Sequence, residues 1–178
     1  MFRLELLSRA HDRDGFDCGS EPLNKYLQQT ARQHTDRGIS RTFVLVQESA
    51  TEPKDVAGYF TLNICQLRAG QLPAEVARRL PREVAGVKLG RLAVAKGQQG
   101  KGIGKLLMVA ALKKFVEVFD SAGGIGLFVD AKDSQIQSYY ERFGFVPLPD
   151  DPLLLFLPLQ TIKEALMHAS AGFHGQPP

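Results

Sequence analysis

Hydrophobic positions follow two periods along the chain, and each period predicts a different kind of element. Short runs of mainly β-branched, aromatic or other apolar residues at 42–46, 56–63 and 87–95 predict strands. A mostly apolar run at 125–129 is typical of a strand buried on both faces. From 103 to 119 the apolar residues recur every three or four positions, which predicts a long helix with one buried face.

Weaker patterns of apolar, capping and turn residues predict the remaining strands and helices. A first strand is predicted at 2–7, and strands at 145–147 and 153–157 form a predicted hairpin, as do 42–46 and 56–63. Capping and helix-breaking residues predict four further helices. One runs from Ser20, as its N-cap, to near Gly38, and a second spans 73–80 and is ended by Pro81. A third spans 134–142 with Ser134 as its cap, and the fourth spans 161–169. The length predicts one domain over 1–170, with a flexible tail at 171–178.

Composition narrows the class of protein. The hydrophobic fraction of 44% is ordinary for a globular core. Cys18 and Cys65 are the only cysteines, and they fit neither a zinc site nor a disulfide framework, so no metal is expected. Because there is no signal peptide and no run of 18 apolar residues, we expect a soluble, cytoplasmic protein without membrane association.

Charge is distributed unevenly, although the net charge is only +3. Residues 68–105 hold nine Lys or Arg and two Glu, a net +7, so the rest of the chain carries −4. This asymmetry favours a polyanionic partner, and the alternative is a solvated loop and helix face. Four arginines are candidate contacts for such a partner. Arg78, Arg79 and Arg82 lie on a predicted helix and loop, and Arg91 lies in the strand at 87–95.

The strand at 87–95 runs into a segment with alternating glycines at 100, 102 and 104, and then into the long helix. We call residues 97–105 the glycine loop. Glycine allows close approach to a ligand, and a helix begins with unpaired N–H groups and a positive dipole end, so the arrangement predicts a phosphate site. The alternative is a turn without a ligand. Leu106 after Lys105 excludes the Walker pattern, and the glycine spacing excludes the dinucleotide fingerprint.

Residues 99–104 instead resemble the Gln/Arg-x-x-Gly-x-Gly/Ala signature of the GNAT N-acetyltransferases. A second segment, residues 138–145 with Tyr140 and Gly144, resembles the x-x-Tyr-x-x-x-Gly-Phe segment of that family. The two segments follow each other along the chain in the same order as in the family, and they lie on opposite sides of one strand–helix–strand crossover. The resemblance covers residues 2–160 and implies an α+β GNAT fold, with a mixed central sheet of about six or seven strands flanked by helices.

The resemblance also implies acetyl-CoA as co-substrate and assigns contacts with it. Loop amides are expected to bind its pyrophosphate, and backbone groups of a bulged central strand are expected to bind the pantetheine and the thioester oxygen. Asp133 stands where many relatives carry an Asn that contacts the cofactor, which leaves this contact open. The candidate acetyl-CoA-binding residues are Leu92, Ala93, Val94, Gln99, Gly100, Lys101, Gly102, Ile103, Gly104, Lys105 and Asp133.

Tyr140 is the candidate catalytic residue, because it matches the tyrosine that the family uses as general acid. A phenol has a pKa near 10 and a thiol one near 8.5, so full proton transfer to the leaving thiolate is uphill by about 2 kcal/mol. A strong hydrogen bond to the developing thiolate is the alternative. Tyr139 is the alternative residue, and only one of the two can face the thiol, since they point about 100° apart on a helix.

The central strand from 87 to 95 carries no carboxylate, whereas many GNAT enzymes place a general base there. A lysine amine with a pKa near 10.4 needs a base, but an α-amine near 7.7–8.0 hardly does. An aminoacyl ester lowers the α-amine pKa further. The missing base therefore favours a substrate such as aminoacyl-tRNA, with a water chain or Asp130 as the alternative route for the proton.

A narrower resemblance joins several upstream segments to the GNAT toxins of bacterial toxin–antitoxin modules. The segments are Phe-Asp-Cys-Gly at 16–19, Leu-Asn-x-Tyr-Leu at 23–27, Thr-Phe-Val at 42–44, Gly-Tyr-Phe-Thr-Leu at 58–62 and Gly-Arg-Leu-Ala-Val at 90–94. This resemblance implies acetylation of the α-amine of aminoacyl-tRNA, inhibition of translation and a ribbon-helix-helix antitoxin as partner, and leaves a homodimer open. The alternatives are acetylation of a small-molecule amine or a protein N-terminus, and an acetyl-CoA-binding module without catalysis.

Overall fold

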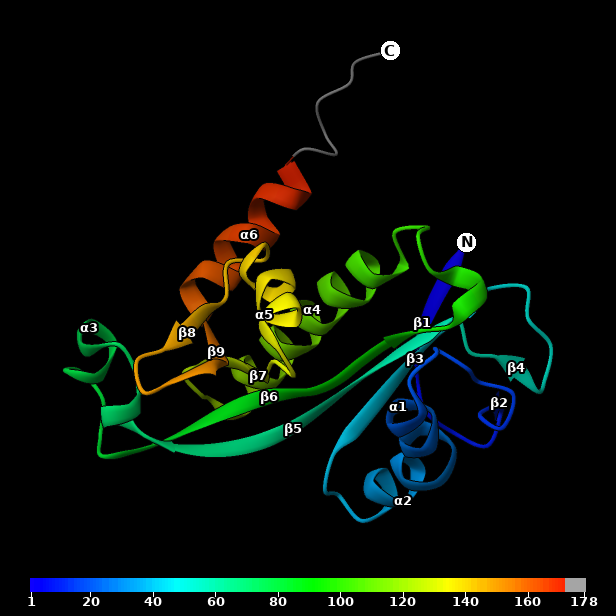
Figure 1. The fold of residues 1–178 in the computed structure, drawn as a ribbon, viewed down its shortest axis with the longest axis horizontal. Coiled ribbons are helices and arrows are strands. Elements are labelled where there is room, and N and C mark those ends of the chain that lie inside the picture. Colours follow the sequence, from blue (N-terminus) through cyan, green and yellow to red (C-terminus); the bar gives the residue numbers. More distant parts are fainter. Residues whose placement is uncertain (172–178) are drawn as a thin grey trace. The chain divides into compact units, whose positions relative to one another are not determined.

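The computed structural model describes residues 1–171, and its main element is a mixed seven-stranded sheet flanked by helices (Figure 1). The strand order is β1-β3-β5-β6-β7-β9-β8, in which β6 and β7 run parallel. The strands are β1 Phe2–Leu6, β3 Arg41–Gln47, β5 Gly58–Arg68, β6 Glu83–Val94, β7 Gly126–Asp130, β8 Val146–Leu148 and β9 Asp151–Pro158. A separate pair joins β2 (His11–Asp12) to β4 (Lys54–Asp55).

The helices follow the predicted order with different lengths. They are α1 Glu21–Lys25, α2 Ala31–Asp36, α3 Ala74–Ala77, α4 Ile103–Ala122, α5 Ser134–Glu141 and α6 Leu159–Ala171. A π-helical turn at Tyr26–Thr30 joins α1 to α2, and short 3₁₀ turns lie at Ala69–Gln71 and Lys96–Gln98. The predicted tail at 172–178 lies outside the described residues.

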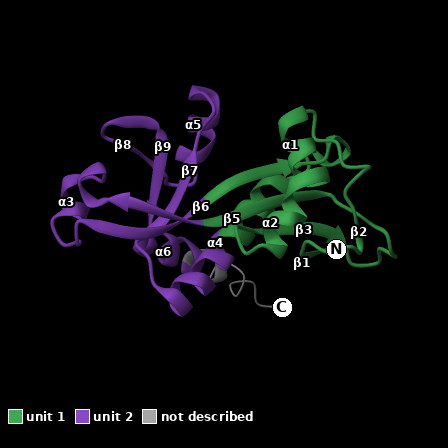
Figure 2. Cartoon of the chain, turned by 90° about the horizontal axis from the view of Figure 1, so that it is seen from below, with its two compact units in different colours: residues 1–63, 89–111 green, residues 64–88, 112–178 purple. Residues whose placement is uncertain are grey.

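The chain divides into two compact units (Figure 2). The first unit holds residues 1–63 and 89–111, and the second holds 64–88 and the chain from 112 onward. Strands β5 and β6 and helix α4 each contribute residues to both units. The glycine loop belongs to the first unit, and the two candidate tyrosines belong to the second.

The core of the first unit forms between the helical segment 21–36 and strands β3 and β5. Val44 and Val46 lie on one face of β3, because alternate residues of a strand point the same way. Tyr26 and Leu27 pack in the same cluster and are buried, so the helical segment turns an apolar face to these strands. Ser20 is the N-cap residue as predicted, but its side chain makes no capping hydrogen bond.

The core of the second unit is built around stacked aromatic rings. Phe128 of β7 and Phe156 of β9 lie with ring centroids 4.8 Å apart. Gly86 of β6 makes room for them, because a Cβ there would lie 2.5 Å from Cε2 of Phe128. Leu67 and Val84 complete the cluster from β5 and β6. The buried parallel strand predicted at 125–129 is thus confirmed as β7.

Several predicted elements differ from the structure. The helix predicted at 73–80 is a single turn, α3, after which the Arg79 and Leu80 N–H groups donate three residues back, to the Val76 and Ala77 carbonyls, so the α-helical bonding stops. The flanking strands are correspondingly longer: β5 continues to Arg68, and β6 begins at Glu83 rather than at 87. The N-cap of α5 is Asp133, not Ser134, since Oδ1 of Asp133 accepts a hydrogen bond from the Ile136 N–H at 2.9 Å.

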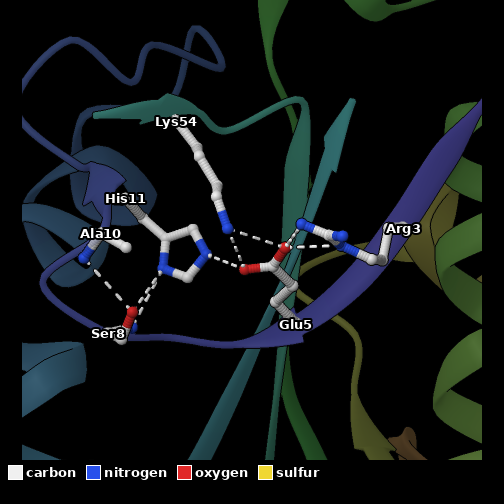
Figure 3. Close-up of polar contacts among 6 residues, drawn as sticks. All are labelled: Arg3, Glu5, Ser8, Ala10, His11 and Lys54. Atoms are coloured by element: carbon white, nitrogen blue, oxygen red, sulfur yellow. Dashed lines mark hydrogen bonds and ion pairs between the residues drawn. The ribbon is translucent and has the colours of Figure 1, made fainter. Parts of the chain in front are cut away.

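A polar cluster near the N-terminus joins side chains from β1, β2 and β4, and no pattern in the sequence predicts it. Glu5 of β1 accepts hydrogen bonds from Lys54 Nζ at 3.0 and 3.1 Å and from Arg3 Nε at 2.7 Å (Figure 3). His11 is buried, and its Nδ1 accepts from the Ser8 N–H, so Nε2 donates to Glu5 at 3.0 Å. The hydrogen bond from Lys54 is the largest effect that lowers the Glu5 pKa, to about 2.

Candidate active site

The glycine loop begins after the end of β6 and runs into the first turn of α4. Gly100 has φ of 73° and Gly102 has φ of 79°, a left-handed backbone that favours glycine. A Cβ on either residue would meet nothing within 4 Å, so this part of the loop is open to a ligand. Gly104 lies inside α4 with no positive φ, so only two of the three glycines have the conformation for which glycine is needed.

Helix α4 starts directly from this loop. The Leu106 N–H donates to the Gly102 carbonyl at 3.1 Å, which makes Gly102 the first acceptor of the helix. The N–H groups of Ile103, Gly104 and Lys105 precede that bond and have no acceptor one turn earlier within the helix. These donors and the positive end of the helix dipole suit a bound phosphate, as predicted.

The polar side chains of the loop differ in their freedom to contact a ligand. Lys101 Nζ donates to the Gly97 carbonyl at 2.6 Å, and Lys105 is exposed. The Gln99 side chain is engaged, because its Nε2 donates to the carbonyls of Cys18 at 2.9 Å and Val94 at 3.0 Å. Gln99 therefore offers a ligand its backbone rather than its side-chain amide.

The strand that precedes the loop passes close to β5. A Cβ on Gly58 would lie 2.8 Å from the Ala93 carbonyl oxygen, and the Ala95 N–H donates to the Ala57 carbonyl at 2.9 Å. Ala93 is buried, while Leu92 and Val94 are half-buried. The ladder of β6 with β7 pairs Val87–Lys88 with Leu127–Phe128 and ends there within the described residues.

The two candidate tyrosines lie on α5 in different surroundings. Tyr140 is buried with its ring edge-on to Phe145, centroids 5.5 Å apart, and burial raises its pKa to about 12. Tyr139 packs against Phe143 and beneath the Arg142 guanidinium. Its hydroxyl is buried and has no hydrogen-bond partner within residues 1–171, and burial raises its pKa as well.

Two carboxylates with proposed roles are already engaged. Asp133 is exposed and uses Oδ1 to cap α5, which leaves Oδ2 for any other partner. Asp130, the alternative base, lies in an ion pair with Lys88, with Oδ2 2.6 Å from Nζ. Glu83, which the longer β6 adds to the strand, accepts from Gln66 Nε2 at 2.8 Å.

The candidate arginines are all exposed, and within residues 1–171 none of them forms an ion pair. The Arg91 guanidinium lies 3.7 Å from the Tyr26 ring centroid, a cation–π geometry that fixes its position. Arg78, Arg79 and Arg82 lie around α3 and the start of β6. The Tyr26 ring thus belongs to the core cluster and also contacts Arg91, which no local sequence pattern indicates.

Two negative findings concern the described part of the chain. No group of three or more His, Cys, Asp or Glu side chains is placed to hold a metal ion there. Within residues 1–171 no helix is both long and apolar enough to span a membrane.

The glycine loop before α4, the tyrosine on α5 and the mixed sheet are together the features of a GNAT acetyltransferase. Residues 38–147 match the family model described as "Acetyltransferase (GNAT) domain", and the chain belongs to this family. It is 32% identical over 151 residues to a tRNA-acetylating toxin of Mycobacterium tuberculosis, covering 85% of this chain and 88% of that protein.

Two solved structures of the protein AtaT are also similar. AtaT complexed with acetyl-methionyl-tRNAfMet matches with a TM-score of 0.84 and 29% identity, over 93% of this chain and 99% of AtaT. A tyrosine-to-phenylalanine mutant of AtaT, bound to acetyl-CoA and to the C-terminus of the antitoxin AtaR, matches with a TM-score of 0.78 and 28% identity, over 93% and 98% of the two chains. The predicted GNAT fold is thereby confirmed.

Proposed function

We propose that this enzyme transfers the acetyl group of acetyl-CoA to the α-amine of aminoacyl-tRNA and acts as the toxin of a type II toxin–antitoxin module. The similarity to a tRNA-acetylating toxin over most of both chains is the observation that carries this proposal. The AtaT complexes with an acetylated aminoacyl-tRNA and with an antitoxin segment support the same substrate and the same kind of partner. For this chain the partner is a ribbon-helix-helix antitoxin.

Acetyl-CoA supplies a thioester whose carbonyl carbon is attacked by the amine. The free N–H groups at the start of α4 and the open backbone of Gly100 and Gly102 hold the pyrophosphate. Backbone groups of residues 92–94 bind the pantetheine and the thioester oxygen, and a preorganised donor to such an oxygen is worth roughly 3–4 kcal/mol. Lys105 and Lys101 add positive charge, although the Lys101 ammonium also bonds to the loop itself.

Tyr140 assists the leaving thiolate through a hydrogen bond rather than by full proton transfer. Its pKa is raised to about 12, so it keeps its proton throughout the working range of the enzyme. The thiol of the leaving group has a pKa near 8.5, so complete proton transfer from Tyr140 to the thiolate is uphill by about 5 kcal/mol. The same transfer from an unperturbed phenol would cost only about 2 kcal/mol. A charge-assisted hydrogen bond to the developing thiolate avoids this cost and still stabilises the transition state.

The amine needs no strong base of the enzyme. The only carboxylate of β6 is Glu83 at its start, and the alternative base Asp130 is paired with Lys88. At pH 7 an α-amine with a pKa near 7.7–8.0 is about 9–17% uncharged, whereas a lysine side chain near 10.4 is less than about 0.1% uncharged. This difference favours an aminoacyl ester over a lysine as the acceptor.

The test is a competition for labelled acetyl groups. The enzyme is given radiolabelled acetyl-CoA with a pool of charged tRNA, with polyamines, or with ribosomal N-terminal peptides. We expect label in the charged tRNA and none in the same tRNA after deacylation. Label confined to polyamines or peptides would support acetylation of a small amine or a protein N-terminus instead.

A further inference from the structure

Residues 17–19 form a turn that is tied to Lys96, which directly precedes the glycine loop, and to Gln99 within the loop, although about 80 positions separate the two segments. Three contacts join them. The Lys96 N–H donates to the Asp17 carbonyl at 2.9 Å, Lys96 Nζ lies 2.6 Å from Asp17 Oδ2, and Gln99 Nε2 donates to the Cys18 carbonyl at 2.9 Å. Gln99 also bonds to the Val94 carbonyl, so its side chain bridges the turn, the end of β6 and the loop.

The turn is braced from its other side by α1. Asp17 Oδ1 accepts from the Gly19 N–H at 2.8 Å and from Asn24 Nδ2 at 2.9 Å. Asn24 is buried, and its Oδ1 accepts from the Cys18 N–H at 2.9 Å and from the Cys18 thiol at 3.1 Å. Gly19 has φ of 87°, which favours glycine at this point of the turn.

The charges at this contact neutralise each other. The Asp17 pKa is lowered to about 2, chiefly by the hydrogen bond from Lys96, and the same contact raises the Lys96 pKa. The pair therefore stays charged at neutral pH, and the ammonium of Lys96 is directed to Asp17 rather than to an anionic ligand. Both side chains are about half exposed, and exposed ion pairs add little to folding stability.

We propose that Asp17, Asn24, Lys96 and the Gln99 side chain form a clamp that holds the glycine loop in the shape that binds the pyrophosphate of acetyl-CoA. The residues of the clamp are positioning residues, since they bond to the loop and to one another. They raise affinity by reducing the conformational freedom that the loop loses when the ligand binds. The inference rests on the proposed role of the loop in acetyl-CoA binding.

A double-mutant cycle on Asp17 and Lys96 tests the clamp, with acetyl-CoA affinity measured by calorimetry. Asp17→Asn and Lys96→Met should each weaken binding about tenfold, as expected for lost preorganisation. The double variant should be no weaker than either single variant, because both changes release the same contact. KM for acetyl-CoA should rise in step, with kcat within about twofold and the unfolding temperature nearly unchanged.

The sign of the Asp17→Asn effect distinguishes the clamp from a direct phosphate contact by Lys96. If the Lys96 ammonium bound the pyrophosphate, Asp17→Asn would free it, and affinity would stay the same or increase. That result would overturn the clamp, as would two single variants with wild-type affinity. If wild-type enzyme itself fails to bind acetyl-CoA, the proposed role of the loop is wrong, which is a different outcome.

Two further variants complete the design. Lys25→Met removes a comparably exposed lysine that pairs with Glu21 in the same unit, and it should leave acetyl-CoA affinity unchanged. Gln99→Met removes the two side-chain hydrogen bonds to Cys18 and Val94 and should weaken binding like the ion-pair variants. A Gln99→Met enzyme with wild-type affinity would contradict the claim that its side chain belongs to the clamp.

Discussion

At the scale of single residues, burial and hydrogen bonding distinguish the two candidate tyrosines. Tyr140 and Tyr139 are neighbours on one helix, yet only the hydroxyl of Tyr139 is both buried and without a partner within residues 1–171. An unsatisfied buried hydroxyl costs stability, because it has lost its hydrogen bonds to water without gaining a partner. The sequence pattern identified the pair, but it could not show this difference, which depends on Phe143 and Phe145.

Replacing Tyr140 by Phe removes the hydroxyl and keeps the packing against Phe145. We expect acetyl-CoA affinity to be retained and turnover to fall about 10²-fold or more, the usual scale for a positioned acid or hydrogen-bond donor. Steady-state kinetics with charged tRNA measure the loss. Tyr139→Phe should keep turnover and should not lower stability, because it removes an unpartnered hydroxyl. Normal turnover in Tyr140→Phe with loss in Tyr139→Phe would reverse the assignment.

Glu5 offers a stability test, because its charge is matched to that of Lys54, whose side chain is only 14% exposed. Glu5→Gln leaves that ammonium without its counterion and should lower the free energy of unfolding by about 1–3 kcal/mol at pH 7. The folded pKa of about 2 lies below the ordinary 4.5, so the contribution of Glu5 is present above pH 4.5 and is lost as pH falls toward 2.

Urea unfolding at a series of pH values checks this sign. The difference between wild type and Glu5→Gln should be constant near neutral pH and should shrink below pH 4.5. A difference that grows on acidification would show that ionised Glu5 does not stabilise the folded state.

At the scale of elements, the sequence patterns predicted those helices, strands and loops that depend mainly on interactions between neighbouring residues. The glycine loop, α4 and the start of β7 were predicted, because glycine spacing and apolar periodicity are properties of neighbouring residues. The π-helical turn after α1 and the length of β5 and β6 were not, because they depend on packing and pairing with distant segments. The ties of Gln99 and Lys96 to residues 17 and 18 are invisible to any local pattern for the same reason.

The glycine loop has a sharp test in Gly102→Asp. The substitution forces an L side chain into φ of 79° and places a negative charge at the start of α4. A Cβ there meets nothing within 4 Å, so the loss should fall on the ligand rather than on internal packing. We expect acetyl-CoA binding to be largely abolished in calorimetry.

Gly38→Asp is the matched control for backbone strain. Gly38 has φ of 72°, a Cβ there also meets open space, and the residue follows α2 in the same unit. Both variants should lose similar stability, but Gly38→Asp should bind acetyl-CoA normally. Unchanged affinity in Gly102→Asp would remove the loop from the cofactor site.

At the scale of the whole molecule, the uneven charge is the feature that the proposed tRNA substrate is expected to contact. Phosphate contacts dominate the affinity of nucleic acids through counterion release, and residues 68–105 carry +7. Two of those lysines, Lys88 and Lys96, are paired with aspartates, whereas the candidate arginines form no ion pair within the described chain. The sequence predicted the excess charge, but only the structure shows which part of it is unpaired.

Replacing Arg78, Arg79 and Arg82 together by Ala should raise KM for charged tRNA and flatten its salt dependence. Each phosphate contact that is lost should reduce the slope of log affinity against log salt by about 1. Acetyl-CoA affinity should not change, because these side chains have no proposed contact with it. The charge-matched control replaces three exposed basic residues elsewhere in the chain by Ala: Arg9, Lys25 and Arg37.

That control triple should leave the salt slope at the wild-type value. If both triples changed KM equally, net charge alone would explain the effect and the arginines would have no specific role. Binding of tRNA that is insensitive to salt and to either triple would favour a small amine as substrate.

The central claim is that the acetyl group ends on the α-amine of an aminoacyl-tRNA. The most direct measurement is mass spectrometry of the 3′-terminal aminoacyl-adenosine, released by nuclease from charged tRNA after incubation with enzyme and acetyl-CoA. The account predicts a gain of one acetyl group on the aminoacyl moiety with wild type and a much smaller yield with Tyr140→Phe. An unmodified terminal nucleoside with active enzyme, or an acetyl group on the tRNA body, would contradict it.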